Sequence, residues 1–282
     1  RSLVGSEMCI RDRDGTGTTQ IFLKSDNVGE EALDLIQRMT RESTLQFTGT
    51  VSEKRPPKVN EGEPTPPPAY EVIASSVNLI ARAVAPLPLG ITDTVHVALD
   101  TRLDNRFLDL RRSHVNAMFH LRGKILQYGR EALINEGFFE THTPKIVATA
   151  TEGGTDLFPM MYFDTPAFLN QSPQLFKQLC MSGGLERVFE IGPAFRAEKH
   201  DTYRHLNEFI SFDIECSWAT DDDVMGVLER MIHHMWSSIS KDEESQKHID
   251  TINQFRETQG EGPIEVIVPD LPFPRVSYCD AV

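Results

Sequence analysis

The sequence predicts an α+β protein with a small β-barrel at its N-terminal end. Helical and strand-like runs alternate in the second half, where the strands read as antiparallel neighbours rather than a doubly wound sheet. In the first ninety residues, short strands surround one amphipathic helix, which favours a barrel. The chain has no Walker lysine loop and no GxGxxG motif, so a P-loop or dinucleotide-binding fold is not supported.

Three strand-like runs and one helix make up the expected barrel. The runs cover residues 20–24, 45–51 and 70–84, and a DGTG turn lies at 14–17. Residues 30–39 have helical spacing because Leu33, Ile36 and Met39 recur at intervals of three. Six prolines in SEKRPPKVNEGEPTPPPA, residues 52–69, predict an exposed insertion.

A basic connector follows at residues 86–115. PLPLGI is stiff and extended, and TRLDNRFLDLRR then places four arginines, at 102, 106, 111 and 112, within eleven residues. One interpretation is a solvated helical face. The other is a hinge that contacts nucleic-acid phosphates.

The second half begins with a long helix. Apolar residues three to four apart between 118 and 132 predict this helix, which ends at Gly137. The later elements are a strand at 138–144, a hairpin of 160–163 with 167–170, a helix from Ser172 to Gly183-Gly184, strands at 187–191, 194–198 and 205–217, and a last helix at 221–239.

Composition limits the functional classes. The 282 residues carry a net charge of −14, so any nucleic-acid contact must come from a local patch. Four cysteines without CxxC spacing predict neither a metal cluster nor a disulfide framework, and favour a reducing, cytoplasmic location. No stretch of about 18 apolar residues occurs, so we expect no membrane partner.

The charged segment FRAEKHDTYRHLNEF, residues 195–209, lies between two strand-like runs. Alternate residues of a strand share a face. If the two runs pair, one face collects Arg196, Glu198, His205, Phe209 and Asp213. Such a face suits a nucleotide, although an ion-paired, solvated sheet face is the alternative.

Each of these side chains has a plausible partner on a nucleotide. Phe209 offers a flat surface for a base, and Glu198 can accept hydrogen bonds from an exocyclic amine. Arg196 presents a rigid fork to phosphate or carboxylate oxygens. Arg204 and His205 can hold the outer phosphates.

A second group of residues suits a small zwitterion with an additional carboxylate. Glu152 lies in a glycine-rich loop that can close over a ligand, and Gln174 and Lys177 share one helical face. Lys177 could pair with the carboxylate, and Glu152 and Asp213 with an ammonium group. A solvated lysine is the alternative.

These motifs resemble those of class II aminoacyl-tRNA synthetases. FRAE with RHLNEF resembles the second signature of the class, and FFETHTP resembles the first, which builds the family's dimer interface. TEGGTDLF, FLNQSPQLFKQ and VFEIGPAFRAE resemble aspartyl-tRNA synthetases of the eukaryotic and archaeal type. The resemblance implies an OB-fold anticodon-binding domain at 11–90, a hinge at 91–115 and a catalytic domain at 116–282.

The resemblance also implies residue roles. Arg196 contacts the α-phosphate and the amino-acid carboxylate, and is the one residue assigned to catalysis. Glu198 and Phe209 contact adenine, and Arg204 and His205 contact the outer phosphates. Aspartate is bound by four further residues, Glu152, Gln174, Lys177 and Asp213, and tRNA by Gln20. Lys177 favours aspartate over asparagine, because a buried charge left unpaired is costly.

The implied reaction is aspartate–tRNA ligation. ATP activates L-aspartate to aspartyl-adenylate, Mg²⁺ bridges the phosphates, and the 3′ end of tRNA(Asp) takes the aspartyl group. A homodimer through the helix and strand ending at Pro144 is expected, and a multi-synthetase complex is a further possible partner. The alternatives are an asparaginyl-tRNA synthetase, a catalytically dead synthetase-like tRNA-binding protein, and a free-standing OB-fold binder.

The sequence departs from the family at both ends. The third signature, with its ATP-binding arginine and acidic metal ligands, is expected downstream of Val282, so we expect an inactive fragment with no metal ligands of its own. Residues 1–10, RSLVGSEMCI, resemble nothing in the family and are predicted to be foreign or misassembled.

Overall fold

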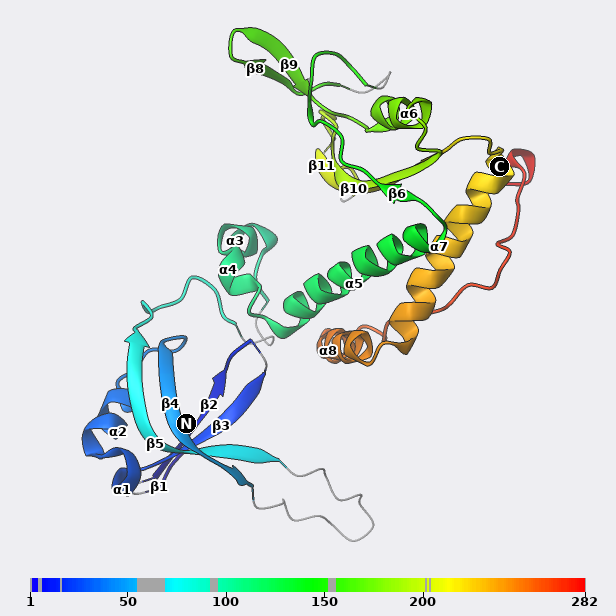
Figure 1. Cartoon of the computed structure of the whole chain (residues 1–282). Coiled ribbons are helices and arrows are strands. Elements are labelled where there is room, and N and C mark those ends of the chain that lie inside the picture. The colour runs from blue at the N-terminus through cyan, green and yellow to red at the C-terminus, as the bar shows by residue number, and fades with distance from the viewer. Residues whose placement is uncertain are drawn as a thin grey trace. The chain divides into compact units, whose positions relative to one another are not determined.

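The computed structural model describes the chain except for residues 1, 5, 6, 16, 55–68, 92–95, 152–155, 201, 203 and 282. It divides into two compact units, Arg1–Pro88 and Leu89–Val282. Each unit combines helices with sheets in which most strand pairs are antiparallel (Figure 1). The predicted α+β class is confirmed.

The N-terminal unit contains one five-stranded sheet and two helices. The elements are β1 (Ser2–Val4), β2 (Glu7–Arg13), β3 (Thr18–Lys24), α1 (Ser25–Val28), α2 (Glu30–Gln37), β4 (Thr44–Glu53) and β5 (Tyr70–Ala81). The strand order is β1-β2-β3-β5-β4, with β3 and β5 parallel and the other pairs antiparallel. The predicted strands and helix are therefore present, although β5 ends at Ala81 rather than at residue 84.

The core of this unit lies between the sheet and α2. It consists of Met8, Ile21, Leu23, Leu33, Ile36 and Ala74. Met8, which is only 1% exposed, belongs to the segment that the sequence predicted to be foreign, and β2 includes residues 7–10. Among the described residues the sheet is open, with β1 and β4 at its two ends, so a closed barrel is not shown.

The second unit contains two three-stranded sheets and the longer helices. The elements are α3 (Leu99–Asp104), α4 (Arg106–Asp109), α5 (Ser113–Asn135), β6 (Phe139–Glu140), β7 (Ile146–Val147), β8 (Pro159–Tyr162), β9 (Thr165–Leu169), α6 (Gln174–Ser182), β10 (Arg187–Phe195), β11 (Glu208–Cys216), α7 (Asp221–Lys241), α8 (Glu243–Thr258) and α9 (Tyr278–Ala281). One sheet has the order β11-β10-β6 and the other β7-β9-β8.

Helices α5 and α7 cover one face of the β11-β10-β6 sheet. Their buried residues form a common core with Phe189 of β10. The core comprises Ala132, Leu133, Phe138, Phe189, Val227, Met231 and Met235. Because this face is packed, the opposite face of β10 and β11 is the one that can receive a ligand.

Several predicted boundaries were wrong. The strand predicted at 138–144 is paired only at 139–140, where it runs parallel to β10. The break in the strand predicted at Gly192-Pro193 is absent, and β10 continues to Phe195. Beyond Phe189, where its pairing with β6 ends, β10 is an edge strand, and an edge strand tolerates a proline. Helix α8 was missed, since its sequence is mostly polar and its apolar periodicity is weak.

Candidate active site

The antiparallel register of β10 and β11 builds the exposed face of the sheet. Phe209 lies opposite Ala194, Ser211 opposite Gly192, and Asp213 opposite Glu190. The Arg196 guanidinium lies 5.4 Å from the centroid of the Phe209 ring, within cation–π range. The predicted placement of Arg196, Phe209 and Asp213 on one surface, hereafter the β10–β11 face, is confirmed.

Small residues keep space open on this face. A Cβ atom at Gly192 would lie 2.7 Å from Glu190 Oε1. The glycine therefore lets the Glu190 carboxylate lie along the strand. Together with Ala194, it leaves the middle of the face free of bulky side chains.

Helix α6 supplies a cation to the same face. Lys177 is fully buried, and its Nζ donates a hydrogen bond to Asp213 Oδ1 and lies 3.6 Å from Glu215 Oε2. Burial lowers the pKa of Lys177, while the charge of Glu215 acts in the opposite direction. The acids are the accessible part of the cluster, since the side chains of Asp213 and Glu215 are 26% and 23% exposed.

A second ion pair lies beside this cluster. The Glu190 carboxylate, 2% exposed, accepts hydrogen bonds from Lys145 Nζ at 2.5 Å and Thr143 Oγ1 at 2.7 Å. Lys145, Glu190 and Glu215 are not among the predicted site residues. The alternation of side chains that placed Asp213 on the face also places Glu190 and Glu215 there. Strand alternation in the sequence would therefore have been sufficient to predict these two acids.

The buried side chain of Asn170 holds the surrounding segments together. Its Oδ1 accepts hydrogen bonds from Thr151 Oγ1 at 2.8 Å and from the Ser172 N–H at 2.9 Å. Its Nδ2 donates to the Pro144 carbonyl at 3.0 Å, and its own carbonyl accepts the Phe195 N–H. Asn170 therefore ties the loop before residue 152, the start of α6 and the end of β10 to one point.

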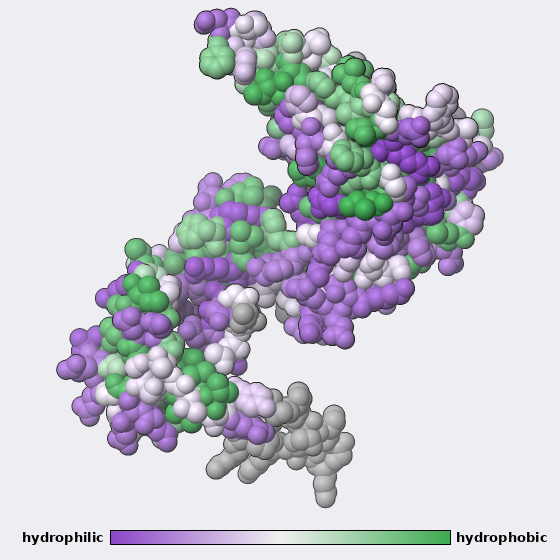
Figure 2. Space-filling view, in the orientation of Figure 1, coloured by the Kyte–Doolittle hydropathy of each residue, from purple (hydrophilic) through white to green (hydrophobic). Residues whose placement is uncertain are grey.

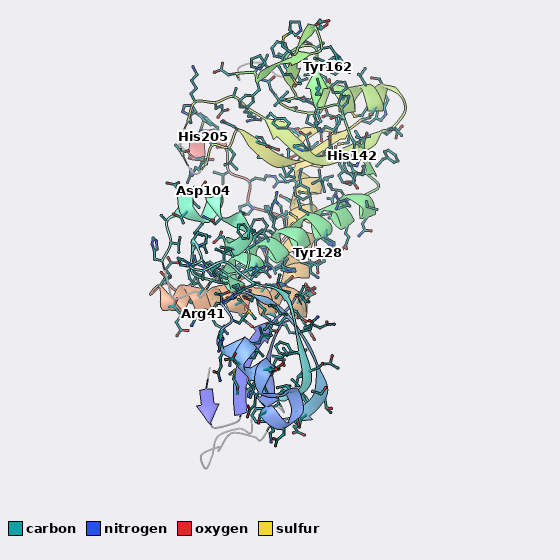
Figure 3. All side chains as sticks on the ribbon, turned by 90° about the vertical axis from the view of Figure 1, so that its left-hand side faces the viewer. Arg41, Asp104, Tyr128, His142, Tyr162 and His205 are labelled. Atoms are coloured by element: carbon teal, nitrogen blue, oxygen red, sulfur yellow. The ribbon has the colours of Figure 1, made fainter. Side chains whose placement is uncertain are left out.

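The remaining predicted nucleotide contacts lie in an irregular segment after β10. Glu198 is half-buried, and Arg204 and His205 are exposed. His205 is labelled in Figure 3. Its Nδ1 lies 2.6 Å from Thr202 Oγ1, and its ring centroid lies 4.8 Å from that of His200. The strands predicted at 194–198 and 205–217 therefore extend too far toward this segment, because β10 ends at Phe195 and its pairing with β11 begins only at Glu208.

The three other predicted contacts come from α6, from β3 and from outside the described residues. Gln174 is exposed at the start of α6, one turn before Lys177. Glu152 lies outside the described residues. Gln20 belongs to β3 in the other unit, where its Nε2 donates to Glu71 Oε2 at 3.0 Å.

The basic connector is organised around a buried carboxylate. Asp109 is 0% exposed and pairs with Arg102 at 2.8 Å and Arg106 at 2.5 Å, while Arg112 is also buried. Burial raises the pKa of Asp109, but Arg102, Arg106 and Arg112 more than offset this and lower it. Arg102 and Arg106 pair with Asp109 while their side chains stay 23% and 38% exposed. Contact of this connector with nucleic-acid phosphates stays a prediction.

A family comparison decides the assignment. The family of class II tRNA synthetases (D, K and N) matches residues 98–282, which include the whole β10–β11 face. The chain belongs to this family. The class II synthetase resemblance of the sequence is thereby confirmed.

Curated relatives of this class II synthetase chain carry a narrower name. Aspartate–tRNA(Asp/Asn) ligase of Archaeoglobus fulgidus is 44% identical over 278 residues, which are 99% of the chain and 60% of that protein. Aspartate–tRNA(Asp) ligase of Thermoplasma volcanium is 43% identical over 270 residues, 96% of the chain and 58% of that protein. The chain therefore spans less than two thirds of these relatives.

Solved class II synthetases share the fold. Asparaginyl-tRNA synthetase from Pyrococcus horikoshii, complexed with asparaginyl-adenylate, superimposes with a TM-score of 0.78 at 29% identity over 99% of the chain and 60% of that protein. Aspartyl tRNA synthetase from Entamoeba histolytica gives 0.76 at 29% identity over 99% of the chain and 56% of that protein. Within the described residues, no helix combines the length and apolar character needed to cross a bilayer.

Proposed function

We propose that the chain is part of an aspartate–tRNA ligase, in which the β10–β11 face binds ATP and L-aspartate. The observation that carries the proposal is the Arg196 guanidinium over the Phe209 ring, on the face that also holds the Lys177–Asp213 pair. A base-sized aromatic surface, a phosphate-binding fork and a charge-paired cluster suit an aminoacyl-adenylate. The names of the curated relatives support the choice of aspartate.

The nucleotide contacts follow the predicted roles. Adenine stacks on Phe209 and is hydrogen-bonded by Glu198. Arg196 neutralises the α-phosphate while the aspartate carboxylate attacks it, and Arg204 and His205 hold the outer phosphates. Catalysis then depends on alignment and charge neutralisation rather than on a covalent enzyme intermediate.

The aspartate contacts require an exchange of partners at Lys177. Because Lys177 is buried beneath Asp213 and Glu215, the accessible charges of the cluster are negative and first attract the substrate ammonium group. The side-chain carboxylate of aspartate then takes the place of Asp213 at Lys177 Nζ. The released Asp213 carboxylate, with Glu152 and Gln174, holds the ammonium end.

Mg²⁺ is expected with ATP, but the residues assigned to the phosphates do not fit as its ligands. Mg²⁺ binds oxygen donors, whereas Arg196, Arg204 and His205 offer only nitrogen. No step of the proposal depends on a metal held by this chain.

The N-terminal unit and the dimer complete the proposal. The sheet of β1–β5 is part of an OB-fold that binds the tRNA(Asp) anticodon, with Gln20 as one contact, and residues 91–115 are the hinge to the catalytic domain. A homodimer forms through α5 and β6, where Met118, Phe119 and Phe139 are 45%, 40% and 57% exposed. A cytoplasmic location and a multi-synthetase complex stay predictions.

Binding of non-hydrolysable adenylate analogues to the chain tests the site. Isothermal titration calorimetry should show tighter binding of the aspartyl than of the asparaginyl analogue, and Lys177→Met should reduce that preference by roughly 100-fold. Phe209→Ala should weaken both analogues equally. Preference for the asparaginyl analogue would support an asparaginyl enzyme, and binding of neither would support the catalytically dead tRNA-binding alternative.

Catalysis is tested on a fusion protein. It joins this chain to the region of a curated relative that the chain does not cover. ATP–pyrophosphate exchange should depend on aspartate, should not be supported by asparagine, and should be lost in Arg196→Ala. Exchange that survives Arg196→Ala would remove Arg196 from the mechanism.

A further inference from the structure

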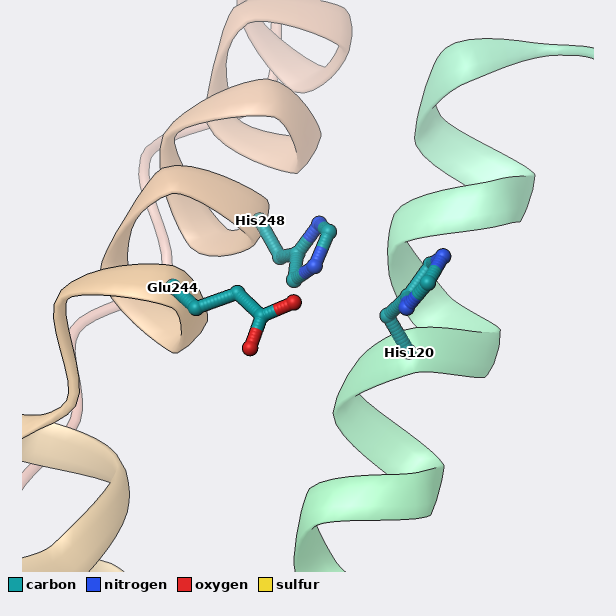
Figure 4. Close-up of side chains that lie close together, drawn as sticks. All are labelled: His120, Glu244 and His248. Atoms are coloured by element: carbon teal, nitrogen blue, oxygen red, sulfur yellow. The ribbon is translucent and has the colours of Figure 1, made fainter. Parts of the chain in front are cut away.

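Two histidines and a glutamate meet between α5 and α8, away from the β10–β11 face (Figure 4). His120 projects from α5, and Glu244 and His248 project from α8. One candidate ligand atom from each residue lies within 4.8 Å of the other two. The two imidazole rings are stacked, with centroids 4.6 Å apart and planes inclined by 13°.

The helices themselves create this meeting point. Glu244 and His248 are four residues apart, so they lie on the same face of α8. Helix α8 packs against α5, which brings His120 to that face. The start of α8 is fixed by Asp242, whose carboxylate accepts hydrogen bonds from the N–H and hydroxyl of Ser245.

The buried nitrogen of His248 points to a missing ligand. Its Nε2 is shielded from solvent and has no hydrogen-bond partner within the part of the chain that the structure describes. Buried polar atoms in native proteins are normally satisfied by protein, water or an ion. A cation held by both imidazoles and the carboxylate would satisfy it.

We propose that His120, Glu244 and His248 form a binding site for a divalent first-row transition metal, with Zn²⁺ as the preferred ion. Two imidazoles and one carboxylate are a ligand set that suits zinc, and three protein ligands leave a fourth position for water. Tetrahedral zinc with bonds of about 2.0–2.1 Å places its ligand atoms about 3.3 Å apart. Because imidazole binds a metal in the plane of its ring, the exposed His120 ring must turn out of its stack with His248, and the exposed Glu244 side chain rotates toward the same point.

Lys124 is the internal competitor for this site. Its Nζ lies 2.7 Å from Glu244 Oε2 and 3.2 Å from Asp242 Oδ2, one turn of α5 beyond His120. A bound metal must share Glu244 with this ammonium group and tolerate its charge. Removing the lysine charge should therefore strengthen metal binding, whereas removing any ligand should weaken it.

Zinc titration of the chelator-treated chain, in the presence of a reducing agent, tests the site. We expect one Zn²⁺ bound per chain, with affinity at least tenfold weaker in His120→Ala and His248→Ala and several-fold stronger in Lys124→Met. His142→Ala removes an exposed histidine outside the cluster and should leave the affinity unchanged. Co²⁺ substitution should give the intense visible absorption of a four-coordinate site.

Folding and adventitious binding are separated by a second measurement. Because a ligand that binds only the folded state raises its melting temperature, zinc should stabilise the parent chain and His142→Ala but not His120→Ala. His120 is exposed, so its replacement should leave the circular dichroism spectrum unchanged. The proposal is overturned if the His120→Ala/His248→Ala double variant binds zinc as tightly as the parent, or if the parent binds none at micromolar zinc.

Discussion

Lys177 carries a charge at a position with no solvent exposure. Its ion pairs with Asp213 and Glu215 compensate this buried charge. Lys177→Met keeps the length of the side chain but leaves Asp213 and Glu215 without their cation. We expect the free energy of unfolding to fall by about 2 kcal/mol, below the full cost of breaking a buried pair because both acids are partly exposed. Urea denaturation measures this change.

The exposed Lys199 provides the matched control, since Lys199→Met should change stability by less than about 0.5 kcal/mol. A double-mutant cycle with Asp213→Asn should return a coupling energy for the pair. Equal stability of Lys177→Met and the parent would show that the ion pair makes no net contribution.

At the residue scale, strand alternation was sufficient to place Phe209 and Asp213 on one face. The same reasoning could not show that Lys177 lies against Asp213, because that contact depends on how α6 crosses β11. Nor could it find Asn170, whose role comes from hydrogen bonds to segments distant in sequence or at a turn. Contacts fixed by tertiary packing leave no periodic signal.

At the scale of the element, the packing of α5 depends on a glycine. A Cβ atom at Gly129 would lie 2.4 Å from Phe212 Cε1 and 3.1 Å from Met235 Sδ. Gly129→Ala should therefore destabilise the chain by about 1–2 kcal/mol, because overpacking outweighs the gain in helix propensity of about 1 kcal/mol.

Gly123 lies in the same helix but faces open space. Apart from its chain neighbours and the backbone of its own helix, no heavy atom lies within 4 Å of the point that a Cβ atom would occupy. Gly123→Ala should stabilise the chain by up to about 1 kcal/mol. Thermal or urea unfolding of the two variants should thus move in opposite directions. If Gly129→Ala and Gly123→Ala both stabilise the chain, the core around Phe212 accommodates the added methyl group without loss of stability.

The predicted elements were most accurate where hydrophobic periodicity and end signals agreed. The helix predicted at 221–239 opens with three aspartates at 221–223, and α7 covers Asp221–Lys241, with a capping box of Thr220 and Asp223 at its start. Helix α8 lacks a periodic apolar run, and its surface in Figure 2 is mainly hydrophilic. Its existence depends on packing against α5, which the sequence does not display.

On the scale of the whole molecule, the two units have separate cores. Both tryptophans, Trp218 and Trp236, belong to the second unit, so selective tryptophan fluorescence follows the unfolding of that unit alone. Leu23→Ala should cost about 2–5 kcal/mol in the first unit and shift the circular dichroism transition without shifting the fluorescence transition. Leu133→Ala should shift the fluorescence transition.

Coincident transitions that move together in both variants would show that the units unfold as one. The contrasting texture of the sequence, short strands around one helix against longer helices between strands, indicated two structural regions, whereas the domain and hinge roles assigned to them stay predictions. The sequence could not fix the closure of the first sheet, because closure depends on which edge strands meet rather than on the strands themselves.

The carboxamide of Asn170 has a property that neither an aspartate nor a leucine side chain shares. Its nitrogen must donate to Pro144 while its oxygen accepts from Thr151 and Ser172. An aspartate at this position offers no donor, and a leucine offers neither function. Hydrolysis of this amide would keep both accepted hydrogen bonds but set a carboxylate oxygen against the Pro144 carbonyl, so chemical ageing at Asn170 would release the Pro144 segment from the start of α6 and the end of β10.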